Sequence, residues 1–311
     1  MNIHLDTDLG GDMDDLCALA MLLRWPGDVQ LTGVTTVGDI GGERAGLVRY
    51  VLELAGCVDV PVAAGVDGRD ARFRYELGVP LQECYWPEPI PPAPGAPDDA
   101  VRLLKRSIEQ GATIIAIGPY SNLALLEQQY PGILLQADLY LMGGFVYPTR
   151  PGFPDWGNDY DFNIQVDVRS AQYVIEHSNP TLIPLSVTVE TFIRRAYLER
   201  LRGVGALGRL IAHQAEVFAA DEHNEETHGR TCGGLPEDII NFQHDPLACA
   251  IALGWRDGVE IRELPLRLEV RDGWLHEVID PAGRPARVVT GVDGAGFSEF
   301  WLDVVTGGAV G

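Results

Sequence analysis

The chain has 311 residues, enough for one large α/β domain or for two or three smaller ones, and 46% of them are hydrophobic. It has 23 Lys and Arg against 45 Asp and Glu, a net charge of −22 that argues against a partner held through phosphate contacts, such as a nucleic acid. The N-terminus lacks the basic and apolar regions of a signal peptide, and no apolar stretch approaches a membrane span. We therefore expect a globular protein of the cytoplasm that binds neither nucleic acid nor membranes.

Short β-type runs alternate with segments of helical periodicity along most of the chain. The predicted strands are Asn2–Leu5, Gln30–Val37, Val60–Ala63, Thr113–Ile117, Leu139–Met142 and Thr181–Leu185. The predicted helices are Asp14–Trp25, Glu43–Ala55, Asp98–Glu109, Asn122–Gln129, Arg169–His177, Val204–Ala220 and Pro246–Leu253, and the tail after Glu260 is predicted to be rich in β-structure. The alternation predicts an α/β fold with a mixed, mostly parallel sheet and flanking helices. Because nothing marks a linker, we expect residues 1–311 to form a single domain.

Two long segments, Gly65–Pro94 and Asp221–Pro236, fit neither pattern. The first contains Tyr85 and Trp86, and the second is rich in His, Glu and Gly. Long loops inside a compact domain are usually lids or disordered connectors, so both segments are candidates to cover a site.

The densest chemical signal is the segment Asp6-Thr7-Asp8-Leu9-Gly10-Gly11-Asp12-Met13-Asp14-Asp15, which places five carboxylates between the first strand and the first helix. Like charges at this spacing repel one another, and a helix N-terminus or a bound cation relieves the repulsion. Helix capping explains two of these acids but not all of them. Since carboxylate oxygens suit Ca²⁺ or Mg²⁺, and since ligands bind at the strand ends of open α/β sheets, the segment predicts a metal site.

Other cation and phosphate motifs fit this segment less well. An EF-hand loop that starts at Asp6 needs Glu at its twelfth position, where Cys17 stands. A Mg²⁺-dependent phosphatase of the dehalogenase kind also begins with Asp-x-Asp, but there we expect Thr or Val where this chain has Gly10. The phosphatase stays open as an alternative, with Asp6 as its nucleophile. The sequence contains neither glycine-rich fingerprint of a nucleotide-phosphate loop.

Further polar clusters fall where a parallel sheet brings strand ends to one edge. They are Thr35–Asp39, Ile117–Asn122 and Met142–Gly144, which follow predicted strands, and Asp161–Asn163 and His244–Pro246, which come later in the chain after a loop. Each alone has a simpler explanation as a helix cap or a turn. Their combination with the acid-rich loop favours one shared site.

Taken together, these residues resemble the inosine–uridine-type nucleoside hydrolase family. The segments that carry the resemblance cover most of the chain: Asp6–Asp15, Gly33–Val37, Ala64–Gly65, Gly118–Ala124, Leu141–Gly144, Phe162–Ile164 and His244–Ala248. The resemblance implies a Rossmann-like core and Ca²⁺-dependent hydrolysis of the N-glycosidic bond of ribonucleosides, with release of a free base and ribose. It also implies a role in nucleoside catabolism or salvage and a homo-oligomer, either a dimer or a tetramer.

The resemblance assigns roles by position. It implies that the metal ligands are Asp8, Asp15, the Ile117 carbonyl and Asp245, and that Asp8 is the general base that takes a proton from the attacking water. The ion would also grip the ribose hydroxyls, while surrounding carboxylates stabilise an oxocarbenium-like transition state.

On the substrate side, the resemblance implies that Asp14, Asp161 and Asn163 hold ribose hydroxyls. It also implies that Met142 and Phe162 are structural or line the pocket. It implies that His244 assists the departing base, because an ordinary histidine pKa of ~6.5 suits an acid near neutrality. In the second loop, His223 and His228 are competing acids.

Several positions depart from the family pattern. The first loop is two residues longer than its commonest form, so that Asp12 is extra. Asp39 stands where many members have Asn, and Asp161 stands where many have Glu. Asp155 and Asn158 compete for the role of an upstream Asn. We include Asp39 and Asn158 among the predicted substrate-binding residues.

The sequence leaves the preferred base open, although stacking on Trp86 or Trp156 would suit a purine. The sequence also leaves open a third interpretation of the protein, besides a hydrolase and a phosphatase. The altered residues Asp39 and Asp161 are compatible with a nucleoside- or ribose-binding protein that keeps the metal pocket and has lost efficient catalysis.

Overall fold

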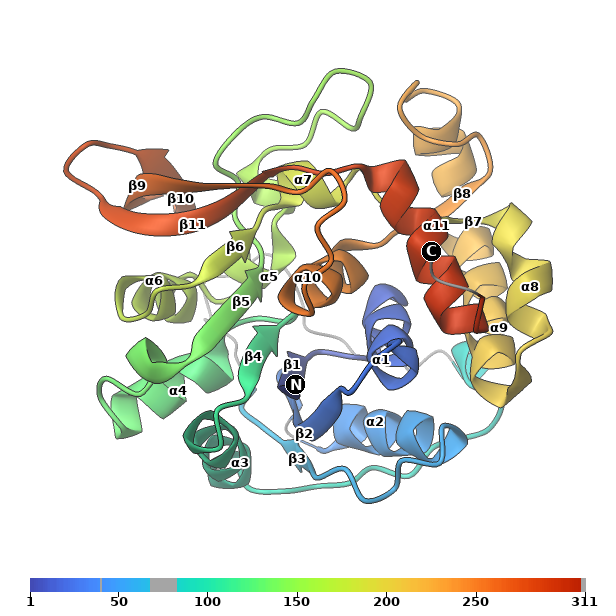
Figure 1. Ribbon diagram of the computed structural model, residues 1–311, viewed down its shortest axis with the longest axis horizontal. Coiled ribbons are helices and arrows are strands. Elements are labelled where there is room, and N and C mark those ends of the chain that lie inside the picture. The colour runs from blue at the N-terminus through green and yellow to red at the C-terminus, as the bar shows by residue number, and fades with distance from the viewer. Residues whose placement is uncertain (40, 68–82, 309–311) are drawn as a thin grey trace.

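The centre of the computed structural model, which describes residues 1–39, 41–67 and 83–308, is a nine-stranded sheet (Figure 1). The strand order is β10-β9-β11-β6-β5-β4-β1-β2-β3. From β3 to β11 every neighbouring pair is parallel, and β9 and β10 join antiparallel at one edge. The bounds are β1 Asn2–Thr7, β2 Gln30–Thr36, β3 Val62–Ala64, β4 Thr113–Ala116, β5 Asp138–Met142, β6 Thr181–Ile183, β9 Glu260–Arg271, β10 Trp274–Ile279 and β11 Arg284–Gly291. The predicted α/β fold with a mixed, mostly parallel sheet is confirmed.

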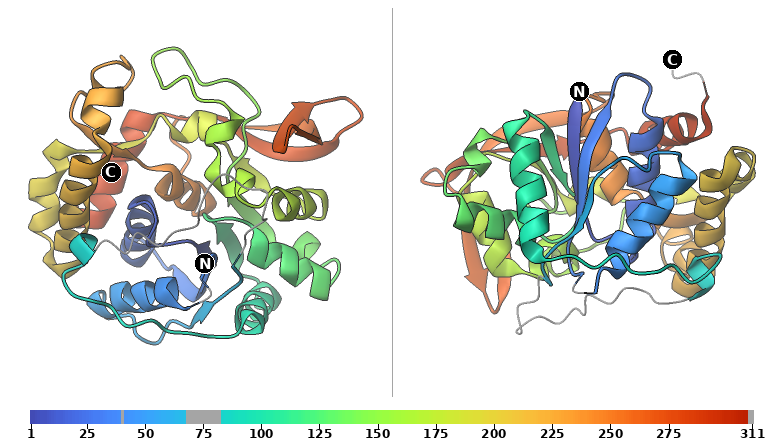
Figure 2. Two further views of the ribbon diagram at one scale, coloured as in Figure 1. Left: turned by 180° about the vertical axis from the view of Figure 1, so that it is seen from behind. Right: turned by 90° about the horizontal axis from the view of Figure 1, so that it is seen from below.

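Helices pack on both faces of the sheet (Figures 1 and 2). One hydrophobic cluster joins the sheet to α3, α4 and α6, and a larger one joins it to α1, α2, α8, α9, α10 and α11. The main helices are α1 Asp14–Arg24, α2 Glu43–Leu54, α3 Pro97–Glu109, α4 Ser121–Gln129, α6 Val168–Glu176, α8 Leu198–Arg202, α9 Gly205–Glu222, α10 His244–Ala252 and α11 Gly294–Thr306. Two short helices, α5 (Phe162–Gln165) and α7 (Leu185–Thr188), follow strand ends, and β7 (Phe192–Arg194) pairs with β8 (Ile239–Phe242) in a second small sheet.

Helix α3 illustrates how the local sequence produces these elements. Pro97 occupies its first turn, and the Asp99 carboxylate accepts a hydrogen bond of 3.1 Å from the backbone N–H of Ala96. Buried Val101 and Leu104 then recur at helical spacing and face the sheet. Every predicted strand and helix occurs in the structure with bounds shifted by a few residues at most.

The structure adds elements that the sequence pattern did not indicate. The tail after Glu260 forms the predicted β-structure but ends in α11, which is capped by the Asp293 side chain and buries Phe297 and Trp301. Glycines at its start obscure the helical period there. The segment predicted as the loop Asp221–Pro236 contains the end of α9 and a π-helix, η5 (Glu225–Gly229). Of the predicted loop Gly65–Pro94, residues 68–82 lie outside the described residues.

The strands β9, β10 and β11 form a hairpin extension at the upper left of Figure 1. Its edge strand, β10, is attached to the segment that follows β5 through the backbone of Leu275. The Leu275 N–H donates to Gln165 Oε1 at 2.9 Å, and the Leu275 carbonyl accepts from Gln165 Nε2 at 2.9 Å and from Asn158 Nδ2 at 3.1 Å. The extension thereby supports η3 (Asn158–Tyr160) and α5.

No helix within the described ranges has both the length and the apolar composition needed to cross a membrane. The carboxyl ends of β1, β2, β4 and β5 lie at the same edge of the sheet, because these strands are parallel neighbours. The N-termini of α1 and α10 lie against this edge, since α1 and α10 pack together and α10 contacts β4 and β5.

Candidate active site

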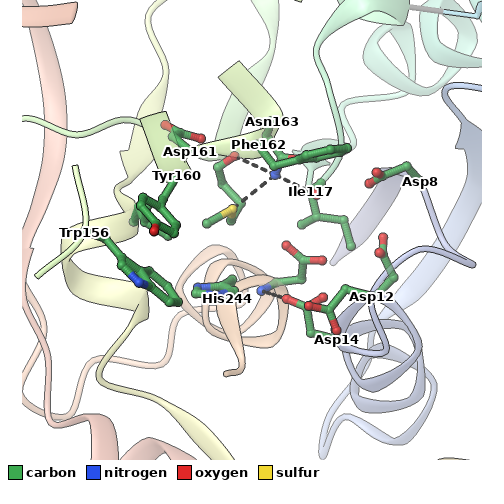
Figure 3. A pocket seen from close by; sticks show the side chains of 14 residues that line it. Asp8, Asp12, Asp14, Ile117, Trp156, Tyr160, Asp161, Phe162, Asn163 and His244 are labelled. Atoms are coloured by element: carbon green, nitrogen blue, oxygen red, sulfur yellow. Dashed lines mark hydrogen bonds between the residues drawn. The ribbon is translucent and has the colours of Figure 1, made fainter. Parts of the chain in front are cut away.

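A pocket of about 310 Å³ opens at the carboxyl edge of the sheet. Asp8, Asp12 and Asp14 lie on one side of it and Trp156 and Tyr160 lie on the other, with His244 between them and Asp161 beside Tyr160 (Figure 3). The lining residues are Asp8, Asp12, Asp14, Asp15, Ile117, Met142, Trp156, Tyr160, Asp161, Phe162, Asn163, Leu185, His244 and Asp245. Open α/β sheets bind their ligands at such an edge.

The acid-rich loop links β1 to α1 and is fixed by its own polar groups. Gly10 has a φ of 109°, a backbone conformation that glycine adopts without strain. The Thr7 hydroxyl donates to the Asp15 carboxylate and accepts from the Leu9 N–H at 3.2 Å. Asp14 and Asp15 form the first turn of α1, where the positive end of the helix dipole favours negative charge.

Three of these carboxylates form a compact cluster. Asp14, Asp15 and Asp245 are each at most 4% exposed, and each offers an oxygen within 4.8 Å of the others. The backbone N–H of Asp245 also donates to Asp14 Oδ2 at 3.3 Å. Burial, and then the repulsion between neighbouring carboxylates, raises the pKa of all three groups. A hard divalent cation would relieve both costs, so the donor set fits such an ion.

Asp8 lies beside this cluster, and a buried arginine donates a hydrogen bond to its backbone carbonyl. Arg44, which is 1% exposed, donates from Nη1 to the carbonyls of Asp8 and, at 3.3 Å, of Leu9, and from Nε to the Gly38 carbonyl at 3.2 Å. Burial raises the pKa of Asp8, and the Arg44 charge partly counters that rise. The guanidinium therefore fixes the backbone of the loop that carries the acids.

The sheet edge beyond Asp8 carries a second group of polar side chains. Asn163 donates from Nδ2 to the carbonyls of Ile117 and Met142 at 2.9 and 3.1 Å. Asp161 caps α5 by accepting from the Ile164 N–H at 3.4 Å, its other oxygen accepts from the Gly144 N–H, and burial raises its pKa to about 7. A carbonyl oxygen has two lone pairs, so the Ile117 carbonyl can accept the Asn163 hydrogen bond and still face an ion.

His244 lies between the acids and the aromatic side (Figure 3). Its Nδ1 lies 2.7 Å from the Thr188 hydroxyl, and the protein around the ring lowers its pKa to about 4. The ring centroid lies 5.5 Å from that of Phe242 and 6.4 Å from that of Trp156. At pH 7 the imidazole is therefore uncharged. A histidine with an ordinary pKa would be partly protonated near pH 7 and could donate that proton as an acid.

Two predicted substrate-binding residues do not line this pocket. Asp39 accepts hydrogen bonds from the N–H groups of Arg44 and Ala45 at 3.0 and 2.9 Å and from the Thr36 hydroxyl at 2.7 Å, so it holds the start of α2. Asn158 lies in η3, where its side chain binds the Leu275 carbonyl. Of the loop histidines, His228 packs edge-on against Trp156, whereas His223 is exposed and lies 4.0 Å from Glu226.

A family model described as inosine-uridine preferring nucleoside hydrolase matches residues 3–299. The chain belongs to this family. A pyrimidine-specific ribonucleoside hydrolase, RihA, of Salmonella arizonae is 30% identical over 259 residues, which are 80% of this chain and 78% of the relative.

Solved structures share the fold. A purine-preferring ribonucleoside hydrolase from Gardnerella vaginalis superposes with a TM-score of 0.76 at 21% identity, over 99% of this chain and 98% of the other. A plant nucleoside hydrolase superposes with a TM-score of 0.76 at 18% identity, over 98% of each chain. The resemblance drawn from the sequence, and with it the expected class of N-glycosyl hydrolase, is confirmed.

The geometry of this nucleoside hydrolase argues against the phosphatase interpretation. Asp6, the nucleophile in that interpretation, is 0% exposed and does not line the pocket. Its Oδ1 accepts hydrogen bonds from the Thr35 hydroxyl and, at 2.8 Å, from Asn122 Nδ2. Asp6 therefore joins β1, β2 and the start of α4 beneath the site.

Sequence reasoning missed several residues of the hydrolase site. Tyr160 and Leu185 line the pocket, and the only signals were their places beside Asp161 and at the end of a predicted strand. Arg44 and Thr188 act on the site through hydrogen bonds that join distant parts of the chain, and no local pattern marks them.

Proposed function

We propose that the protein hydrolyses the N-glycosidic bond of ribonucleosides in a Ca²⁺-dependent reaction that gives a free base and ribose. The observation that carries the proposal is the division of one pocket into a buried carboxylate cluster and an aromatic side. Acids suit an ion, sugar hydroxyls and developing positive charge, whereas rings suit a nucleobase.

The acid side would hold the ion. Asp8, Asp15, the Ile117 carbonyl and Asp245 are the proposed ligands, and Asp14 lies in the same cluster. When bound, Ca²⁺ would offset the negative charge of these acids and lower the pKa of a water molecule beside it. Asp8, whose backbone is fixed by Arg44, would accept the proton of the attacking water.

Asp161 and Asn163 line the same pocket and are the proposed contacts of the ribose hydroxyls, together with Asp14. As the glycosidic bond breaks, positive charge develops on the sugar ring. The surrounding carboxylates are already in place, so they stabilise this charge without reorganising.

His244 would assist the leaving base as a neutral hydrogen-bond donor. If the Thr188 hydroxyl donates to Nδ1 at 2.7 Å, the ring proton is on Nε2. The imidazole then donates to the base as negative charge develops there, and its pKa of about 4 keeps it neutral across the physiological range.

The proposal is tested by sugar release from inosine, adenosine, guanosine, uridine and cytidine, before and after metal stripping and Ca²⁺ return. We expect Asp8→Ala to lower turnover by about 10²–10⁴-fold, because it removes the general base, while the circular dichroism spectrum stays unchanged. Asp28→Ala, which removes an exposed acid outside the pocket, is the matched control. Full activity of Asp8→Ala would overturn the mechanism, and stoichiometric nucleoside binding without base release would favour the binding-protein interpretation.

The proposal extends to the state of the protein in the cell. We propose a single nucleoside hydrolase-like domain over residues 1–311, a cytoplasmic location and a homo-oligomer, a dimer or tetramer, on the strength of the family resemblance. Light scattering of the purified protein measures the oligomeric state directly, and a monomer would contradict that part of the proposal.

A further inference from the structure

The side of the pocket opposite the acids consists mainly of aromatic rings (Figure 3). Trp156 and Tyr160 lie almost parallel, with 4° between their planes and 5.2 Å between ring centroids. Tyr160 is 56% exposed, and Trp156 is partly buried. We name these two side chains the aromatic platform. An exposed tyrosine stacked on a tryptophan presents ring surface to whatever occupies the pocket.

Contacts from distant parts of the chain hold the platform in place. The ring of Phe242, from β8, meets Trp156 at 66° and 5.0 Å, and His228, from η5, meets it at 85° and 5.4 Å. Asn158, in the same turn as Tyr160, is bound to the Leu275 carbonyl. Because the Trp156 ring is packed against other rings before a ligand arrives, little of its side-chain entropy is lost when a base stacks on the platform.

The position of the platform assigns it to the base rather than to the sugar. Asp8, Asp12 and Asp14 lie on the opposite side, Asp161 lies beside Tyr160, and His244 lies between the two sides (Figure 3). A nucleoside bound with its ribose at the acid-rich loop therefore extends its base past His244 toward Trp156 and Tyr160.

Resting on the proposed function, we infer that the aromatic platform makes this hydrolase prefer purine over pyrimidine ribonucleosides. No amide, Lys or Arg side chain lines the platform side among the described residues, so ring area outweighs hydrogen-bond readout of the base edge. Stacking strengthens with overlapped ring area, and a purine has two fused rings where a pyrimidine has one. The preference is opposite to the one in the name of the Salmonella relative.

Trp86, the other tryptophan that the sequence offered for stacking, provides a matched control. Its ring packs edge-on against Tyr50 at 81° and 6.1 Å, and it does not line the pocket. Trp86→Ala removes a tryptophan side chain, as Trp156→Ala does, but leaves the aromatic platform unchanged.

The experiment compares kcat/KM for inosine, adenosine and guanosine with that for uridine and cytidine at saturating Ca²⁺. We expect the unmodified enzyme to favour purines by roughly tenfold or more. Trp156→Ala is expected to lower kcat/KM for purines about 10- to 100-fold, mainly through KM, and for pyrimidines by less than about threefold. Trp156→Phe should restore most of the loss, and Trp86→Ala should leave both classes unchanged.

The outcomes separate the platform from the reaction. A pyrimidine preference, or equal losses on both classes in Trp156→Ala, overturns the inference and leaves the proposed function intact. If Trp156→Ala fails to fold, Tyr160→Ala gives the same comparison, because this exposed ring contributes little to the core. If no nucleoside is cleaved, the proposed function fails, and calorimetry with inosine and uridine decides the inference: tighter inosine binding that Trp156→Ala abolishes supports the platform, and equal affinities overturn it.

Discussion

Replacing Arg44 with Met should destabilise the fold far more than an ordinary helix substitution. The side chain is 1% exposed, and it donates to the carbonyls of Asp8, Leu9 and Gly38. A hydrogen bond from a charged group contributes about 1.5–3 kcal/mol, and each buried carbonyl left without a donor costs about 1–3 kcal/mol. Some of these terms overlap, so we expect the free energy of unfolding to fall by about 3–5 kcal/mol.

Urea unfolding of the metal-stripped protein, followed by circular dichroism, measures this loss. Arg49→Met is the matched control, because Arg49 lies on the same helix and is exposed, and it should change stability by no more than about 0.5 kcal/mol. A difference of less than about 1 kcal/mol between the two variants would refute the account of Arg44 as the support of the acid-rich loop.

Two further predictions concern the acids. Asp39→Asn keeps an oxygen that can cap α2 but removes the charge, so we expect the unfolding free energy to fall by about 0.5–1 kcal/mol. The KM measured in steady-state assays should stay unchanged. A KM several times higher would show that Asp39 contributes to substrate binding. Burial and mutual repulsion raise the pKa of Asp14, Asp15 and Asp245, so the folded protein keeps protons that the unfolded chain releases, and its stability falls as pH rises from about 4 toward neutrality. Thermal melts of the metal-stripped protein should therefore give a higher Tm near pH 5.5 than near pH 7.5, and Ca²⁺ should raise Tm most at the higher pH; a Tm that rises with pH without metal would contradict this.

The sequence predicted the order of strands and helices because each element carries its own period and its own end signals. In α3, for example, Pro97 and Asp99 mark the start, and buried Val101 and Leu104 mark the inner face. The sequence also put Asp8 and Asp15 at the carboxyl end of the first strand, and the family resemblance added Asp245 to the same site; all three line the pocket.

Other parts of the site depend on contacts that no local pattern encodes. The departure from the family pattern at Asp39 suggested a substrate contact, but the carboxylate accepts hydrogen bonds from N–H groups at the start of α2, the helix that follows it. The extra length of the acid-rich loop gave no hint of Arg44, which lies 36 residues after Asp8 along the chain. The choice between Trp86 and Trp156 required the packing of β8 and η5 around Trp156.

The attachment of the hairpin extension formed by β9, β10 and β11 affects how this enzyme can diverge or be redesigned. The hairpin supports η3 and α5 through the main-chain N–H and C=O of Leu275, groups that every residue except proline supplies. Mutations that change the exposed side chains of β9 and β10 leave these bonds in place. A library that varies Val270 and Ile279, both exposed, could therefore give the hairpin new surface properties while η3 and α5 keep their shape.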